Sequence, residues 1–460
     1  MPAEPHCLGA LLRGAGALEG RAFLGRDRTV PFADLAWGTM FGPAGALLAG
    51  RTVLLAVADP LAGGLVLAEL DGLAARILVC APGLDPSHRA EIATRAEAEV
   101  VVHDGPPGAF SSLGLEEVIP FEAPRRGATI HPPVCETEWL LLTSGTTGAP
   151  KIVSHTLRGL TGAIAPPMAG EPPPVWATFY DIRRYGGMQI YLRALLGAGS
   201  MVLPGLDEPL PDLLKRMGAR GVTHVSGTPS HWRRVLMDPN AKAMAPRYVR
   251  LSGEIADQAV LDALAALYPG ARIGHAYAST EAGVGFEVTD GREGFPASFV
   301  AHGVGSVAMK VEDGTLRIRS ARAATRYVGS AEPLADADGF VDTGDAVSLR
   351  GDRYHFEGRR GGIINVGGQK AHPEEIEAVL NAHEAVRMAL VRSRRNPITG
   401  AVVAADVVLG EGASTDLDVA RRDIQDHCRR HLPAWKVPAT IRFVPALDVT
   451  AAGKLARNHA

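Results

Sequence analysis

Cysteine is scarce in this 460-residue chain, which contains only Cys7, Cys80, Cys135 and Cys428. These residues stand far apart and form no C-x-x-C pair, so the sequence predicts neither a zinc knuckle nor a disulfide framework. A chain that relies on no disulfides suits a reducing compartment, and we therefore expect a cytoplasmic protein.

The chain also lacks long apolar runs and a strong excess of either charge. No uninterrupted apolar run reaches the length needed to cross a membrane, and residues 1–6 lack the basic region and apolar core of a secretion signal. The formal net charge is -3, whereas nucleic-acid binding normally leaves a basic excess or patch. We therefore expect no membrane span, no export and no nucleic-acid partner.

Apolar segments such as 53–57 and 77–80 alternate with Ala- and Leu-rich segments of helical spacing. This alternation predicts α/β layering around a parallel sheet. The chain is too long for one compact core, and the dense turn chemistry at Gly361 and Gly362 predicts a flexible boundary. We expect an N-terminal domain over residues 1–360 and a smaller α+β domain over residues 361–460.

A helix is predicted in this C-terminal part over residues 416–431, with a buried stripe made of Leu417, Ala420, Ile424 and Cys428. His427 and His431 stand four residues apart beside the stripe, as two metal ligands can. No carboxylate or third ligand accompanies them, so a role in packing and at the surface is favoured.

The stretch 140–151 breaks from an apolar run into hydroxyls, glycines and one lysine. It predicts a buried strand that leads into a phosphate-holding loop, because glycines let the backbone approach an anion while hydroxyls and a lysine donate to it. The residues proposed for the loop are Thr143, Ser144, Gly145, Thr146, Thr147, Gly148 and Lys151. It is not the P-loop of kinases, since Ala149 and Pro150 separate the last glycine from the lysine. The alternative is a flexible surface turn.

Three more segments, at 222–227, 248–254 and 271–281, each resemble a strand that ends in a small-residue turn. Open α/β sheets bind ligands at such strand ends, so three of them together predict a nucleotide site. The segment 176–187 mixes aromatic and charged residues before a helix predicted from about residue 188 to 196. It would line a pocket wall, or else mark a helix entry with exposed arginines.

Five segments in this order resemble the adenylate-forming superfamily of acyl- and aryl-CoA synthetases, luciferases and nonribosomal peptide adenylation domains. They are the loop at 143–151, Tyr-Ala-Ser-Thr-Glu at 277–281, Asp-Thr-Gly-Asp at 342–345, Gly-Arg at 358–359 running into Gly-Gly-Gln-Lys at 367–370, and Gly-Lys at 453–454. The resemblance covers nearly the whole chain. It implies an α/β fold with a large N-terminal adenylate-forming domain of layered sheets and helices, and a small, mobile α+β C-terminal domain.

The resemblance implies a reaction in two steps. A carboxylic acid is joined to the α-phosphate of ATP with release of pyrophosphate, and a thiol or amine then displaces AMP. The loop at 143–151 would cover the β- and γ-phosphates. Lys454 would bridge the attacking carboxylate and the α-phosphate, where negative charge accumulates, and Glu281 would hold Mg²⁺.

The same resemblance assigns the nucleotide contacts. Asp345 would accept hydrogen bonds from both ribose hydroxyls, with Arg359 as a cationic donor beside it. Tyr277 would stack on the adenine, and Thr280 would touch the α-phosphate. The adenine and phosphate floor would comprise Gly253, Glu254, His275, Ala276, Tyr277, Ala278, Ser279 and Thr280. After the C-terminal domain swings, Gly367 and Gly368 would approach the entering pantetheine thiol.

The sequence departs from the family pattern in three places. The N-terminal part is shorter than usual, which predicts trimmed peripheral subdomains. Gly361 occupies the hinge position that is commonly Asp or Lys, and this puts the resting position of the C-terminal domain in question. Ala278 replaces a common glycine after the adenine tyrosine, a small change that backbone contacts tolerate.

Two sequence elements that relatives use to bind their acid are missing here, and this limits the class of acid that we expect. Amino-acid-activating relatives carry a Phe-Asp-x-Ser segment whose aspartate meets the substrate ammonium, and Asp181 stands here without that pattern. The Phe-His element of many acyl- and aryl-CoA relatives is missing too. We favour a carboxylic acid without an α-amino group. The acceptor would be CoA, because the Gly-Gly-Gln-Lys segment resembles that of CoA ligases more than that of relatives that load carrier proteins.

Two alternatives stay open. One is a stand-alone adenylating enzyme that transfers the acyl group to an amine or to the phosphopantetheine of a separate carrier protein, since no carrier unit follows Lys454. The other is a catalytically silent protein that senses AMP or an acyl-adenylate.

Overall fold

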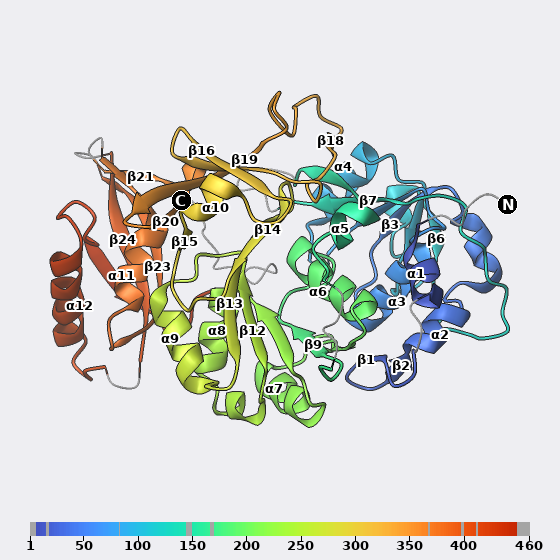
Figure 1. Ribbon diagram of the computed structural model, residues 1–460, viewed down its shortest axis with the longest axis horizontal. Coiled ribbons are helices and arrows are strands. Elements are labelled where there is room, and N and C mark those ends of the chain that lie inside the picture. Colours follow the sequence, from blue (N-terminus) through green and yellow to red (C-terminus); the bar gives the residue numbers. More distant parts are fainter. Residues whose placement is uncertain are drawn as a thin grey trace.

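The computed structural model describes residues 6–14, 18–81, 83–143, 150–165, 170–366, 369–396, 400–410 and 413–448. Figure 1 shows a large N-terminal domain of three layered sheets with helices, and a smaller C-terminal domain at its left side. The predicted α/β class and the division into a large and a small domain are thus confirmed.

A seven-stranded sheet forms the first part of the N-terminal domain, in the order β18-β8-β7-β4-β3-β5-β6. The parallel strands are β3, β4, β5, β6 and β7, as the alternation of apolar segments predicted, and β8 pairs antiparallel with both β7 and β18. The strands are β3 (Thr52–Leu55), β4 (Arg76–Val79), β5 (Val100–Val102), β6 (Glu116–Val118), β7 (Glu138–Leu142), β8 (Ile152–Thr156) and β18 (Arg326–Val328). The helices that accompany them are α1 (Leu8–Gly14), α2 (Phe32–Trp37), α3 (Pro60–Leu70), α4 (Pro86–Arg95) and α5 (Leu157–Thr161).

An eight-stranded sheet follows, in the order β14-β13-β12-β11-β9-β10-β1-β2. It consists of β1 (Ala22–Leu24), β2 (Thr29–Pro31), β9 (Val175–Thr178), β10 (Ser200–Val202), β11 (His224–Gly227), β12 (Tyr248–Ser252), β13 (Arg272–Ser279) and β14 (Gly283–Val288). One face packs its apolar side chains against α7 (Leu210–Ala219), α8 (Pro229–Leu236) and α9 (Gln258–Leu267). The other face meets α6 (Tyr185–Leu196), whose apolar residues belong to the largest core.

A five-stranded antiparallel sheet completes the N-terminal domain, in the order β15-β20-β19-β17-β16. Its elements are β15 (Phe295–Pro296), α10 (Ser298–His302), β16 (Ala308–Glu312), β17 (Thr315–Arg319), β19 (Val341–Arg350) and β20 (Arg353–Arg359). Its core includes residues of β14 from the neighbouring sheet, so the two sheets are held together beside the strand ends described below.

The C-terminal domain has a hydrophobic core of its own. It contains β21 (Ile364–Val366), β22 (Gln369–Ala371), α11 (Pro373–Asn381), β23 (Val386–Asn396), β24 (Gly400–Leu409), α12 (Leu417–His431) and β25 (Thr440–Phe443). The predicted helix and its stripe are confirmed at Ala420, Ile424 and Cys428, but Leu417 is 49% exposed and was wrongly assigned to the stripe. It lies in the first turn of α12, beyond the edge of the core.

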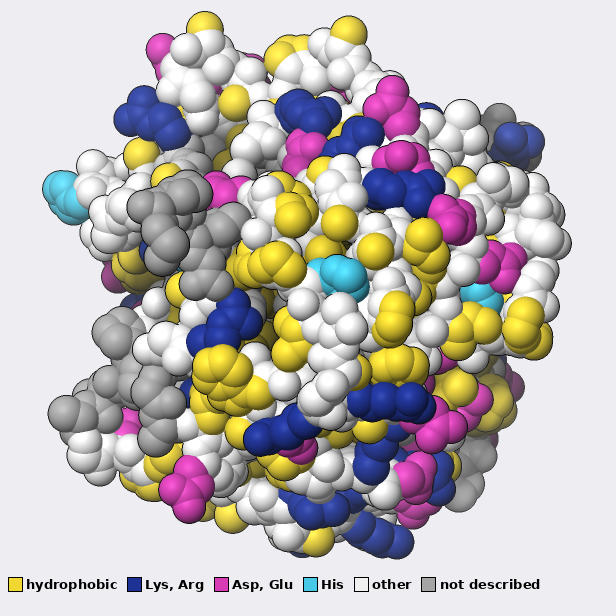
Figure 2. Space-filling model, turned by 90° about the vertical axis from the view of Figure 1, so that its right-hand side faces the viewer, with side chains coloured by type: hydrophobic (Ala, Val, Ile, Leu, Met, Phe, Trp, Pro, Cys, Tyr) yellow, Lys and Arg dark blue, Asp and Glu magenta, His cyan; other side chains and the backbone are white. Residues whose placement is uncertain are grey.

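The surface agrees with the modest net charge. On the face shown in Figure 2, hydrophobic, basic and acidic side chains are interspersed. None of the described helices is long and apolar enough to cross a membrane.

Candidate functional site

Three strand ends meet at one edge of the eight-stranded sheet. β11, β12 and β13 are parallel neighbours, with Ser226 opposite Arg250 and Ser252 opposite Ala276. Because the carboxyl ends of parallel strands share an edge, the turns that follow β11, β12 and β13 lie side by side. The sequence had predicted these turns as parts of one site.

The turn after β12 is tight and polar. Gly253 has a φ of 85°, a left-handed conformation that favours glycine. The Glu254 carboxylate accepts a hydrogen bond from the backbone N–H of Ser230 at 2.9 Å, in the first turn of α8. The Tyr180 hydroxyl donates to the carbonyl of Ser252 at 2.5 Å. The turn is therefore fixed by contacts from two other segments.

Tyr277, Asp345 and Arg359 come together from three strands. The Tyr277 hydroxyl donates to Asp345 Oδ2 at 2.6 Å, and Arg359 Nε lies 3.2 Å from Asp345 Oδ1. The Tyr277 ring is stacked with Phe286 and Phe356, at centroid distances of 5.7 and 5.3 Å. Burial and the neighbouring carboxylate raise the pKa of Tyr277 well above its usual value, so the hydroxyl remains a donor.

Thr280 and Glu281 follow β13 directly. The Thr280 carbonyl lies 2.7 Å from Nε2 of His155, a fully buried residue of β8. Among the described residues, Glu281 has no ion-pair partner, although Arg359 and Tyr327 are within electrostatic range. Within the same residues no group of three or more His, Cys, Asp or Glu could hold a metal. A single free carboxylate fits a hard cation such as Mg²⁺ if phosphate oxygens supply its other ligands.

The predicted phosphate loop is described only at its two ends. Thr143 follows β7 and its backbone N–H donates to the carbonyl of Lys151 at 2.9 Å. The Lys151 ammonium lies 2.7 Å from the Glu332 carboxylate and over the Tyr327 ring. Both members of this pair are about half exposed, so breaking it to reach a phosphate costs little free energy.

Several predicted residues lie outside the described part of the chain: Ser144, Gly145, Thr146, Thr147, Gly148, Gly367, Gly368 and Lys454. The others are placed on the strand ends above. His275, Ala276, Ala278 and Ser279 are residues of β13, and the ring nitrogen Nε2 of His275 lies 2.9 Å from the carbonyl of Arg292.

The segment before α6 does not carry exposed arginines, as one of the two interpretations had expected. Arg183 is only 6% exposed, and its guanidinium donates to the carbonyls of Val57 and Ala58 and to the Asp181 carboxylate. Asp181 also accepts from the Arg183 backbone N–H at 2.9 Å. Asp181 is thereby committed to an internal ion pair with Arg183.

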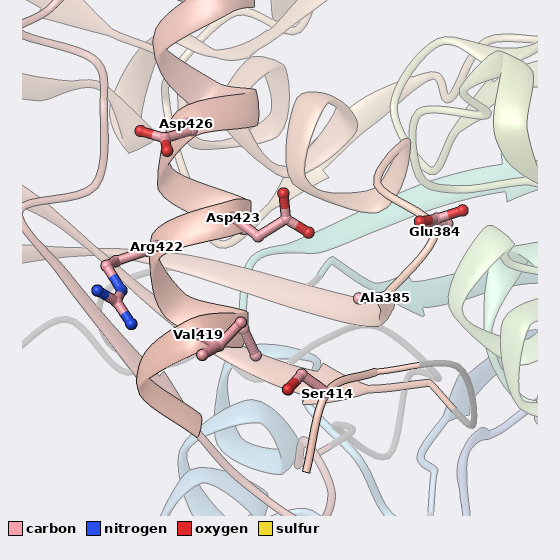
Figure 3. Close-up of a pocket in the computed structure, with 8 residues that line it drawn as sticks. Glu384, Ala385, Ser414, Val419, Arg422, Asp423 and Asp426 are labelled. Carbon is pink, nitrogen blue, oxygen red and sulfur yellow. The ribbon is translucent and has the colours of Figure 1, made fainter. Parts of the chain in front are cut away.

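The C-terminal domain contains a separate hollow of about 510 Å³. Figure 3 shows Asp423 and Asp426 on α12 and Glu384 on a neighbouring turn, while Arg422 projects from another side of the same helix. Such an acidic lining repels phosphates, so this hollow is not a nucleotide site. Nearby, His427 Nε2 donates a hydrogen bond to the carbonyl of Val379 at 3.1 Å.

The comparisons with known proteins identify the family. The model of the AMP-binding enzyme family matches residues 74–321, and that of the AMP-binding enzyme C-terminal domain matches residues 375–454. The chain therefore belongs to the AMP-binding enzymes, within the adenylate-forming superfamily that its motifs resemble.

Among the curated relatives, the human mitochondrial acyl-coenzyme A synthetase ACSM5 is 34% identical over 29% of this chain and 24% of its own length. The 2-methylpropanoate–CoA ligase CCL4 of Humulus lupulus is 28% identical over 70% of this chain and 63% of its own length. The chain thus matches less than two thirds of either relative.

Solved structures confirm the fold along nearly the whole chain. The anthranilate CoA ligase AuaEII in complex with anthranoyl-AMP superimposes with a TM-score of 0.78 at 20% identity, covering 98% of this chain and 96% of the other. A benzoate CoA ligase from Burkholderia xenovorans LB400 gives a TM-score of 0.79 at 20% identity and covers 98% of both chains.

Proposed function

We propose that this protein is an AMP-forming ligase that activates a carboxylic acid with ATP and transfers the acyl group to CoA. The observation that carries the proposal is the contact of Asp345 with Tyr277 and Arg359, in a chain of the AMP-binding enzyme family. A carboxylate held between a phenol and a guanidinium is suited to accept the two ribose hydroxyls.

In this proposal each residue has a separate role in the adenylation step. Mg²⁺ on Glu281 would draw charge from the phosphate oxygens, and Lys151 would leave Glu332 to contact the outer phosphates. Lys454 would hold the attacking carboxylate against the α-phosphate, where a fixed cation stabilises the crowded charge of the transition state. We also propose that the N-terminal domain ends at residue 360 and that the C-terminal domain swings about a hinge at Gly361.

CoA is the proposed acceptor because curated relatives are named as synthetases or ligases of CoA thioesters. An acceptor on a carrier protein or an amine would use the same first step. The test is to supply a preformed acyl-adenylate and to measure acyl transfer to CoA, to a carrier protein and to amines. The acceptor that gives the fastest transfer decides between these possibilities.

The test of the first step is acid-dependent exchange of labelled pyrophosphate into ATP, with a panel of short, long, aryl and amino acids. We expect exchange with one class of acid and a loss of about 100-fold or more in Lys454→Ala. Equal exchange by the wild type and Lys454→Ala would contradict the assigned role of the lysine. ATP binding without exchange on any acid would favour the silent sensor.

A further inference from the structure

A polar stripe runs along the otherwise apolar helix α6. Tyr185, Gln189 and Arg193 are spaced by four residues, so they lie on one side of the helix. Each has a buried polar atom without a partner in good hydrogen-bond geometry: the hydroxyl of Tyr185, Oε1 of Gln189 and Nε of Arg193. Buried polar groups are nearly always satisfied, so three orphaned atoms in one stripe require an explanation.

The stripe faces a buried arginine of β12. Along β12, Val249 and Leu251 point into the core under α8 and α9, while Tyr248 belongs to the core that includes α6. Because side chains alternate along a strand, Arg250 points to the α6 side as well. Arg250 is 4% exposed, and it lies within electrostatic range of Tyr185 and Arg193.

Positive charge is in excess in this layer. Arg193, Arg250 and Arg322 all act on Tyr185, whereas the carboxylate nearby is Glu287, which accepts a hydrogen bond from the Tyr248 hydroxyl. Within the described residues neither Arg193 nor Arg250 has an ion-pair partner. Burial and the neighbouring Arg250 lower the pKa of Arg193 to about 10. An unpaired cation as deeply buried as Arg250 is costly unless an anion joins it.

The layer adjoins the reacting end of the proposed site. The Tyr185 ring lies 5.5 Å from the His155 ring, and His155 in turn contacts the Thr280 carbonyl. Arg250 precedes Ser252, the last residue of β12, by two positions, which places it about 7 Å behind the strand end. Tyr185 therefore links the reacting end at Thr280 to the two guanidinium groups.

We propose that the acid activated by this protein carries a second anionic group, most simply a second carboxylate, and that Arg250 and Arg193 bind it. This inference rests on the proposed function. The second carboxylate supplies the missing partner of the two guanidinium groups, and the monoanionic acid of the same length leaves them unpaired. Discrimination therefore comes from the protein's own unsatisfied charges.

The test compares each diacid with its monomethyl ester in pyrophosphate exchange, using glutarate and isophthalate as an aliphatic and an aryl probe. We expect the wild type to favour at least one diacid by about 30-fold or more in kcat/KM, as for other buried charge pairs. Arg250→Met should bring the ratio of kcat/KM for the diacid over the ester down to about one. Equal activity on diacid and ester in the wild type, or an equal loss on both in Arg250→Met, overturns the proposal.

A stability measurement separates ligand binding from a structural role. Arg250→Met removes an unpaired buried charge, so its Tm should be unchanged or higher. The control is Arg216→Met, which leaves the buried Glu208 carboxylate without its 2.7 Å partner and should lower the Tm without altering acid preference. A lower Tm in Arg250→Met with an unaltered preference contradicts the proposal. If that variant does not fold, Arg193→Met takes its place.

The binding of a second anionic group and the adenylating activity can be rejected independently of each other. Exchange with monoacids alone keeps adenylation and rejects the second anionic group. If no acid supports exchange, calorimetric titration of glutarate and isophthalate into the wild type and Arg250→Met decides the matter. Binding that the variant loses supports the anion site, and no binding to the wild type rejects it.

Discussion

Asp345 is the residue on which the proposed nucleotide site converges. It joins Tyr277 of the eight-stranded sheet to Arg359 of the five-stranded sheet, and its backbone N–H is held by the Thr343 hydroxyl at 3.2 Å. The carboxylate is only 17% exposed. Its orientation is therefore set before any nucleotide arrives, which reduces the entropy cost of binding.

We expect Asp345→Asn to raise the KM for ATP by about tenfold or more, because an amide accepts less strongly and Arg359 loses its counter-charge. The measurement is pyrophosphate exchange at varied ATP. Arg350→Met is the matched control: it removes an exposed pair with Glu357 on the same two strands and should leave this KM unchanged. Equal KM values for the wild type and Asp345→Asn would remove Asp345 from the site.

Sequence alone predicts Asp345 and Arg359 as nucleotide contacts because both lie in short, distinctive motifs, and the structure brings the two side chains together. Sequence alone could not identify Arg250 or the stripe on α6. Their importance depends on which face of β12 meets which helix, and periodicity within one segment does not define that pairing. Arg183 shows the same limit, since its burial depends on carbonyls of Val57 and Ala58 more than 120 residues earlier.

At the scale of elements, the positions of strands with a clear apolar run were predicted correctly from the sequence. The sequence did not predict which distant strands and helices pack together. The segments 248–254 and 271–281 contain β12 and β13, because each run ends in small residues. The helix after residue 416 is also correct, since Asp416 caps it. The helix predicted from residue 188 begins three residues earlier, at Tyr185.

The contact between β20 and α11 gives a prediction at this scale. Gly358 has a φ of 127°, and a Cβ there would lie 2.2 Å from the Glu374 carboxylate. Gly358→Ala should lower the Tm, because it adds a collision to backbone strain. Gly351→Ala is the control, since Gly351 also has a positive φ of 63° but has no atom within 4 Å of such a Cβ.

The difference in Tm between the two variants reports the greater strain at a φ of 127° together with the collision at the domain contact. If Gly358→Ala is no less stable than Gly351→Ala, neither the φ of Gly358 nor its contact with Glu374 constrains the folded state. Thermal unfolding followed by circular dichroism is sufficient for this comparison.

The stability of the whole molecule should depend on pH through its buried histidines. Burial lowers the pKa of His155 and His224 to about 4 and that of His231 to about 3, from 6.5. Between pH 6.5 and about 4 the unfolded chain therefore binds more protons than the folded one, and stability falls as the pH falls through this window.

For the fully buried His155 the loss should approach about 1 kcal/mol per pH unit. Urea unfolding at pH 7.5 and pH 5.0 measures it. His155→Gln retains a donor for the Thr280 carbonyl and should reduce the pH dependence, whereas a substitution at the exposed His302 should not. An unaltered pH dependence in His155→Gln would contradict the assignment.

The pairing of β18 with β8 has a consequence for biosynthesis. β8 ends at Thr156, but the strand that covers its outer edge begins only at Arg326. While the ribosome adds the residues between them, the nascent seven-stranded sheet exposes a free edge that other chains can join. Synthesis at roughly 5–20 residues per second leaves this edge open for about ten seconds or more. A chaperone that shields strand edges would therefore matter most for this protein before residue 328 has left the ribosome.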